Sequence, residues 1–161
     1  MPNWCSNSLT LKHEDPAMID KAVAGFTDGK LLETLVPYGG EWDYNWCVAN
    51  WGTKWDVGGD NGYIRPNPNT LKISFDSAWA PPTEAYRAME ELGFEVKAMY
   101  YEPGMAFAGL YEDGSDDYYE YSDMNAAEVA DTLPTELDEE FGISDQMAEW
   151  EAEQEEDDEQ I

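Results

Sequence analysis

Cations are missing from the last 64 residues of this 161-residue chain, because no Lys or Arg follows Lys97. Residues 1–97 hold all 8 Lys and Arg with 14 of the 36 Asp and Glu, and residues 98–161 hold the other 22 acids. A net charge of −28 at pH 7 repels polyphosphate and anionic lipid, which disfavours direct binding to nucleic acid or to a membrane. Basic protein surfaces are the partners that this charge attracts.

Cysteine, histidine and long apolar runs are also scarce. Cys5 and Cys47 form no CxxC pair, and no N-terminal segment has the charged-then-apolar pattern of a secretion signal. No apolar run approaches the roughly 20 residues that a membrane span needs. We therefore expect a cytoplasmic protein in a reducing compartment.

These shortages disfavour an enzyme. His13 is the single imidazole, and it lies beside Glu14 and Asp15 at a predicted strand-to-helix turn, which favours a solvated loop residue over a general base. Neither cysteine has a recognisable base partner, and no glycine-rich phosphate loop is present. The sequence predicts no catalytic residue and no cofactor.

Acids are abundant, but their spacing does not predict a metal site. The segment Asp56–Gly62 has the glycine and asparagine content of a calcium loop, yet Gly58 and Asn67 occupy ligand positions of the EF-hand pattern. Asp113, Ser115 and Asp117 come closer to that pattern without its central glycine and closing glutamate. We assign no metal ligand, and weak divalent-ion binding at this acidic hairpin stays open.

The hydrophobic pattern predicts an α+β fold over the first part of the chain. Alternation predicts strands at residues 8–12, 71–76 and 94–98, while helical spacing predicts helices from Pro16 to Phe26 and from Pro82 to Leu92. A further strand is expected in Val48–Val57. This order is the ferredoxin-like split βαβ arrangement, an antiparallel sheet with two helices on one face.

Two segments extend this pattern. A Trp-rich insertion covers about residues 31–70, and we expect Trp42, Trp46, Trp51, Trp55 and Trp79 to close the core rather than to stack on a ligand. Residues 105–111 and 118–122 predict a hairpin with an acidic tip at 112–117, followed by short helices at 125–133 and 135–141. The chain then divides into a ferredoxin-like domain (1–111), an acidic tyrosine-rich hairpin with helices (112–145), and an acidic helix or disordered tail (146–161).

Three fragments carry a family resemblance: MPNWCSN at residues 1–7, WGTKWD at 51–56 and FDSAWAPP at 75–82. With Phe107-Ala108-Gly109 after the last core strand, they resemble the YubB-like (DUF1281-type) family of phage and plasmid proteins. The resemblance spans about residues 1–111 and implies a ferredoxin-like fold with an aromatic insertion. Because the function of that family is largely unknown, the resemblance implies a mobile-element context and no reaction.

The acidic third carries the functional hypothesis. Its acids are interleaved with tyrosines and leucines that fold and pack, which a purely solubilising tail does not need. Ordered carboxylates can imitate the phosphates of duplex DNA, so we predict a non-enzymatic DNA mimic that occupies the basic groove of a host nucleic-acid-binding protein, such as a restriction, CRISPR or recombination nuclease. The predicted partner-binding residues, with the tyrosines setting specificity, are Glu112, Asp113, Asp116, Asp117, Tyr118, Tyr119, Glu120, Tyr121, Glu128, Asp131, Asp138, Glu139 and Glu140.

Two other classes stay open at this point. One is a small protein-interaction module with an unknown partner and a solubilising acidic tail. The other is an enzyme that uses the Trp-rich insertion as a substrate pocket, which a metabolite screen by tryptophan fluorescence would test. A homodimer through a sheet edge is also compatible with the sequence.

Overall fold

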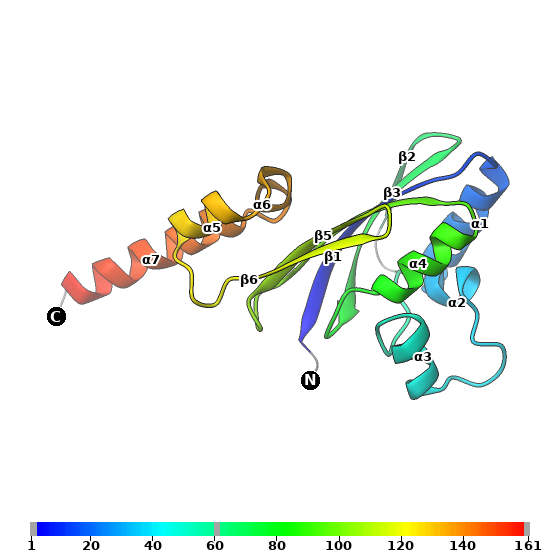
Figure 1. The fold of residues 1–161 in the computed structure, drawn as a ribbon, viewed down its shortest axis with the longest axis horizontal. Coiled ribbons are helices and arrows are strands. Elements are labelled where there is room, and N and C mark those ends of the chain that lie inside the picture. The colour runs from blue at the N-terminus through cyan, green and yellow to red at the C-terminus, as the bar shows by residue number, and fades with distance from the viewer. Residues whose placement is uncertain (1–2, 60–61, 160–161) are drawn as a thin grey trace.

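The computed structural model describes residues 3–59 and 62–159. Met1 and Pro2 of the first family fragment, Asp60 and Asn61 of the glycine-rich loop, and Gln160 and Ile161 of the predicted tail lie outside the described residues. The chain forms one six-stranded antiparallel sheet with helices on both faces (Figure 1).

The sheet is the predicted α+β core with two strands added at one edge. Its strands are β1 (Trp4–Lys12), β2 (Tyr63–Asn67), β3 (Thr70–Ala78), β4 (Glu95–Glu102), β5 (Phe107–Glu112) and β6 (Ser115–Glu120). The order β2-β3-β1-β4 is that of a ferredoxin-like sheet, and the β5–β6 hairpin continues it beyond β4.

Helices α1 (Pro16–Thr27) and α4 (Thr83–Glu91) cover one face, as predicted. Asp15 caps α1 by accepting a hydrogen bond from the Ala17 N–H, and Pro16 occupies the first turn. The main core lies between these helices and the inward residues of β1, β3 and β4, such as Leu9, Ile73 and Ala98.

The insertion differs from its prediction, because no strand forms in Val48–Val57. That segment instead completes the short helix α3 (Tyr44–Asn50) and continues into turns, while a second short helix, α2 (Leu31–Leu35), precedes it. Asp56 shapes this turn by accepting hydrogen bonds from the backbone N–H groups of Leu32 and Glu33 in the first turn of α2. β2, which begins fifteen residues after Val48, takes the place of the expected strand in the sheet.

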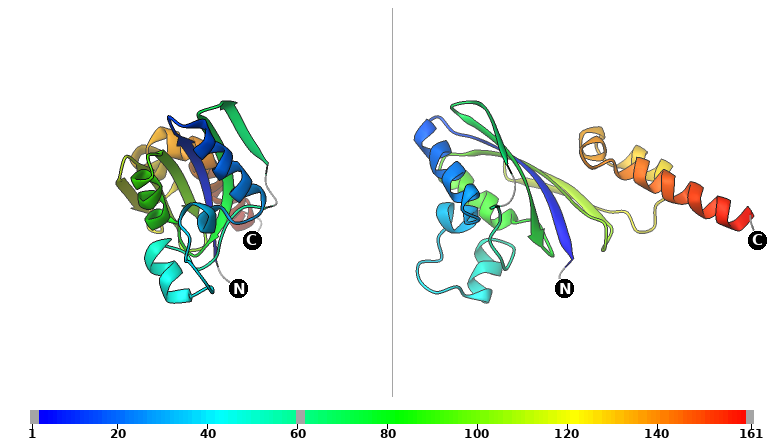
Figure 2. Two further views of the ribbon diagram at one scale, coloured as in Figure 1. Left: turned by 90° about the vertical axis from the view of Figure 1, so that its right-hand side faces the viewer. Right: turned by 180° about the vertical axis from the view of Figure 1, so that it is seen from behind.

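Three C-terminal helices cover part of the second face: α5 (Ala126–Thr132), α6 (Thr135–Phe141) and α7 (Ile143–Glu159). Val129, Leu133 and Leu137 pack with Met99 and Ala108 of the sheet into a second core cluster. Figures 1 and 2 show α5–α7 on the side of the sheet away from α1 and α4, with α7 projecting outward. No helix in the described ranges has the length and apolarity to cross a membrane.

Candidate partner-binding surface

The predicted acidic hairpin forms with a tighter turn than expected. Glu112 is the last residue of β5 and pairs with Ser115, the first residue of β6, so the turn contains only Asp113 and Gly114. Both turn residues have positive φ, 51° and 80°, the geometry for which an Asp-Gly pair is preferred in a two-residue hairpin. The acidic tip predicted at 112–117 was therefore too long, because Asp116 and Asp117 belong to a strand.

β6 is an edge strand, and its alternation separates the predicted residues onto two faces. Asp116, Tyr118 and Glu120 pair with Tyr111, Gly109 and Phe107 and share their face. Asp117 and Tyr119 point to the other face, toward the C-terminal helices. Charges along an edge also keep foreign strands from pairing with it, so these acids protect the sheet whatever else they do.

The three predicted tyrosines have different surroundings. Tyr118 is half-exposed, packs its ring against Phe107 at a centroid distance of 5.4 Å, and donates a hydrogen bond to Glu120. Tyr119 is half-buried against the second core cluster. Tyr121 is only 6% exposed and stacks on Tyr101, so its ring belongs to the interior rather than to a partner-binding surface.

Two of the predicted helical acids cap the N-terminus of a helix. Glu128 completes a capping box with Asn125 at the start of α5. Asp138 is half-buried and accepts hydrogen bonds from the Ser144 N–H (2.7 Å) and Oγ–H (2.6 Å), which caps α7. Asp131, Glu139 and Glu140 are exposed and have no hydrogen-bond or ion-pair partner within the described residues.

Cationic compensation of this region is slight. The Lys97 ammonium contacts the Glu136 carboxylate at 2.5 Å, and this is the one salt bridge to an acid beyond Lys97 among the described residues. The contact raises the pKa of Lys97 above its ordinary value. Glu112 lies opposite Lys97 in the register of β4 and β5, and its charge also raises that pKa. Asp113 and Asp117 are exposed and form no hydrogen bond or salt bridge in the described ranges.

The structure also gathers lysines in a way that the sequence did not indicate. Lys72, Thr10 and Lys97 are register neighbours across β3, β1 and β4 on the second face. With Lys12 they line a groove of about 540 Å³, whose opposite wall includes Glu136 and Glu140 of α6. Glu140 therefore lies beside cations, away from the β6 edge, and the predicted residues do not form one continuous surface.

The tryptophans divide between core and surface. Trp51 is 1% exposed and donates its indole N–H to the Val36 carbonyl, and Trp46 packs against it edge-on, as expected of core residues. The expectation was wrong for Trp42, Trp55 and Trp79, which are about half-exposed, because Leu31, Leu32 and Trp51 already fill this part of the core. Trp55 also packs against Trp4 at 5.9 Å.

The histidine and the two cysteines considered for catalysis are held by hydrogen bonds or buried in the interior. The Asp15 N–H donates to His13 Nδ1, and His13 Nε2 lies 2.9 Å from the Leu92 carbonyl, so both ring nitrogens are engaged. Cys5 and Cys47 are buried, and burial raises the pKa of Cys5 to about 12 and that of Cys47 above its ordinary value. A thiol that resists ionisation is a poor nucleophile.

Metal binding finds little support in the geometry. Within residues 3–59 and 62–159, no three His, Cys, Asp or Glu side chains converge in a way that would hold an ion. Asp113 and Asp117, two of the residues considered for weak divalent-ion binding, are both exposed, the first in the turn and the second in β6.

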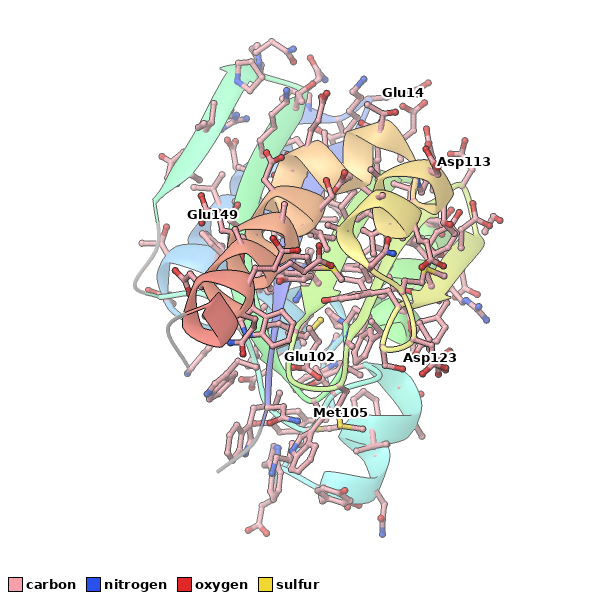
Figure 3. All side chains as sticks on the ribbon, turned by 90° about the vertical axis from the view of Figure 1, so that its left-hand side faces the viewer. Glu14, Glu102, Met105, Asp113, Asp123 and Glu149 are labelled. Atoms are coloured by element: carbon pink, nitrogen blue, oxygen red, sulfur yellow. The ribbon has the colours of Figure 1, made fainter. Side chains whose placement is uncertain are left out.

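Figure 3 shows how the acids are distributed around the molecule. Asp113 and Asp123 lie along one side, at the β6 edge and just beyond it, whereas Glu149 of α7 projects on the opposite side. Glu102 and Met105 lie at the end of the sheet opposite Glu14. The labelled acids of the C-terminal part thus lie on more than one side of the molecule.

Comparison with known proteins gives a partial structural match. No family model matches the chain, and no curated protein is similar to it. A solved structure that matches part of the chain is that of protein api92 from Yersinia pseudotuberculosis, whose family model is DUF1281. The two share 22% identity at a TM-score of 0.42, over 56% of this chain and 39% of that protein. That protein is assigned to the family that the three sequence fragments resemble, and its description names no activity.

Proposed function

We propose that this protein is a DNA mimic of the phage or plasmid type, a non-enzymatic inhibitor that acts in the host cytoplasm. Its partner would be a basic nucleic-acid-binding host protein, such as a component of a restriction or CRISPR system. Carboxylates of the β5–β6 hairpin and of α5–α6 would occupy positions that phosphates normally take. A small interaction module without nucleic-acid mimicry is the alternative.

One observation carries the proposal: the acids that follow the last cation are held on ordered strands and helices. The helices α5 and α6 are fixed to the sheet by Val129, Leu133 and Leu137, which are 0–3% exposed. A solubilising tail needs no such scaffold. Rigid display lowers the conformational entropy lost on binding, and uncompensated charge steers a basic partner from a distance.

Spacing supports the same reading. Duplex DNA carries one charge per roughly 1.7 Å of its axis, so an effective mimic needs closely spaced anions. On one face of the hairpin, Glu112 and Asp117 are diagonal neighbours, because Glu112 pairs with Ser115, and Asp113 follows Glu112 in the turn. Like charges placed so closely destabilise a fold by mutual repulsion, and a binding role offsets that cost.

The test should keep the whole chain, because β5 contributes the fully buried Tyr111 to the main core and a truncation after Met105 would remove it. Five exposed acids that form no hydrogen bond or salt bridge within the described residues are changed to Asn or Gln: Glu112, Asp113, Asp117, Asp131 and Glu139. The matched control neutralises five exposed acids of the first part of the chain: Glu14, Asp28, Glu41, Glu91 and Glu95. Both variants gain the same five units of charge.

Each protein is used for capture from a bacterial lysate at low salt, with and without excess duplex DNA. We expect the native chain and the control to retain a nucleic-acid-binding protein that duplex DNA releases, and the first variant to lose it. Before the capture, sedimentation is measured to check that the native chain and both variants are monodisperse. Capture that survives both neutralisation and DNA would contradict mimicry and favour the interaction module.

A further inference from the structure

Beside β6 lies a hollow that combines aromatic rings with a carboxylate. It has a volume of about 330 Å³ and is lined by Trp79 after β3, Tyr100 of β4, Phe107 of β5, and Asp116 and Tyr118 of β6. Tyr100 and Phe107 are buried and form its inner surface, whereas Trp79 and Tyr118 are 52% and 50% exposed. The hollow therefore presents two accessible rings over an aromatic base.

Trp79 is held there at a cost. Its φ of 71° lies in the left-handed region, which is unfavourable for a residue with a bulky side chain. The conformation is fixed by the Trp79 N–H, which donates to the Asn3 carbonyl at 2.8 Å, and by the Ser77 hydroxyl, which donates to the Ala80 carbonyl at 2.6 Å. Because half of this strained side chain is exposed, burial in the core does not account for its placement.

Asp116 supplies the charge. Its Oδ1 accepts a hydrogen bond of 2.6 Å from the buried Tyr100 hydroxyl, which fixes the carboxylate at the edge of the hollow. Within the described part of the chain its other oxygen, Oδ2, accepts no hydrogen bond. Glu120 lies on the same face of β6 and accepts a hydrogen bond from the Tyr118 hydroxyl, so the surroundings of the hollow are anionic as well as aromatic.

The neighbouring tryptophans already hold a cation of this chain. The Lys54 ammonium lies 4.2 Å from the centroid of the Trp55 ring and 5.7 Å from that of Trp79. Both distances are within the roughly 6 Å over which a ring face attracts a cation. The aromatic edge beside the hollow is therefore suited to positive charge.

We propose that this hollow receives an arginine side chain of the basic partner, so that the site anchors the complex while the surrounding acids attract it. A guanidinium is planar, stacks on aromatic rings and forms directed hydrogen bonds to a carboxylate, whereas a lysine ammonium offers only a point charge. Trp79 and Tyr118 provide the rings, and Asp116 Oδ2 accepts the guanidinium N–H. The inference rests on the proposed function for the identity of the partner but not for the chemistry of the site.

The test uses a short Gly-Arg-Gly repeat peptide as the probe, with peptides of the same length in which lysine or citrulline replaces arginine. Binding to the full chain is followed by the NMR signals of the indole N–H groups, with the Trp79 signal assigned from a Trp79→Phe variant. We expect arginine to shift the Trp79 signal, lysine to do so at least about fivefold more weakly, and citrulline not to do so. Equal effects of arginine and citrulline, or an unmoved Trp79 signal, would overturn the proposal.

Asp116→Asn and Asp117→Asn make a matched pair, because they remove the same charge from adjacent positions that face opposite sides of β6. Asp116→Asn should weaken the arginine peptide about fivefold to tenfold, and Asp117→Asn by less than about twofold. Equal weakening by both variants would refute the hollow while leaving the acidic surface as the binding site. Selective weakening by Asp116→Asn, with no DNA-displaceable partner in the lysate experiment, would instead preserve the arginine site and refute mimicry.

Discussion

At the scale of single residues, the interior holds several side chains that ionise only in alkali. Cys5, Tyr86, Tyr100 and Tyr111 are at most 1% exposed, and Tyr121 is 6% exposed. Burial is the main cause that raises the pKa of each above its ordinary value. Hydrogen bonds reinforce it for Tyr100, which donates to Asp116, and for Tyr111, which donates to Glu90. The neutral form of each group is the one that the fold stabilises.

We therefore predict that the protein loses stability as the pH rises above about 9. The folded state keeps these protons while the unfolded chain releases them from the ordinary values of 9.0 for cysteine and 10.0 for tyrosine, so the stabilisation is complete below those values and is lost above them. Each such group lowers the free energy of unfolding by about 1.4 kcal/mol per pH unit. Urea titrations between pH 7 and 11 measure this, with tyrosinate absorbance as a second signal. Tyrosinate that forms fully before the fold is lost would contradict it.

At this surface, the exposure of individual residues could not be predicted from the sequence. Tyr118 and Tyr121 both lie in a run of acids and tyrosines, and no pattern in that run indicates that one ring is exposed and the other buried. That difference depends on the register of β6 against β5 and on the helices behind it, both of which are tertiary features. The hollow could not be predicted either, because Trp79 and Tyr118 meet only after β3 and β6 are placed.

At the scale of elements, the sequence predicted those whose burial is one-sided. β1, β3, α1 and α4 each bury one face, and the resulting periodicity predicted all four. β4 was predicted from the alternation at residues 94–98, before the point at which both of its faces become buried. β2 was missed because it is an edge strand without a buried residue, contains Pro66, and pairs irregularly with β3. The apolar Trp51 and Val57 suggested a strand in its place, but they fill the core from a helix end and a turn.

Lys97 and Glu136 join α6 to the sheet. We predict that reversing either charge alone lowers the free energy of unfolding, and that exchanging the two charges largely restores it. The two side chains are 36% and 51% exposed, so solvent screens the pair and it contributes only about 0.5–1 kcal/mol. Since the pKa of Lys97 is raised above 10.5, this contribution is present at pH 7 and is lost in alkali, as the pH rises through the pKa of Lys97. Lys97→Glu should destabilise the protein by about 1 kcal/mol or more, because it adds repulsion.

The measurement is urea unfolding of Lys97→Glu, Glu136→Lys and the double variant at pH 7. Recovery of most of the lost stability in the double variant would show direct coupling between the two side chains. Additive losses would mean that α6 is held by Leu137 and its apolar neighbours alone. Arg87→Glu serves as the control, since its contact with Glu84 at 3.9 Å lies within one helix.

At the scale of the whole molecule, the same charge acts on folding and on binding in opposite ways. A net charge of −28 gives self-repulsion, and among the described residues only Arg65–Asp20, Arg87–Glu84 and Lys97–Glu136 form salt bridges. Because salt reduces the screening length from about 10 Å at 0.1 M to about 3 Å at 1 M, it should relieve that repulsion and also weaken attraction to a basic partner.

We therefore predict that raising NaCl from about 0.02 to 0.5 M increases the Tm by about 2–6 °C, since 1 kcal/mol shifts the Tm of a chain of this size by about 2–4 °C. Over the same range, retention of a captured partner should fall steeply. Choline chloride at equal concentration should give the same Tm, because screening does not depend on the identity of the cation. A further rise with CaCl₂ at matched ionic strength would instead indicate specific divalent binding, with Asp113 and Asp117 as the first residues to change. A Tm that falls with salt would mean that the three salt bridges outweigh the repulsion, and the cost that we attribute to the clustered carboxylates would not exist.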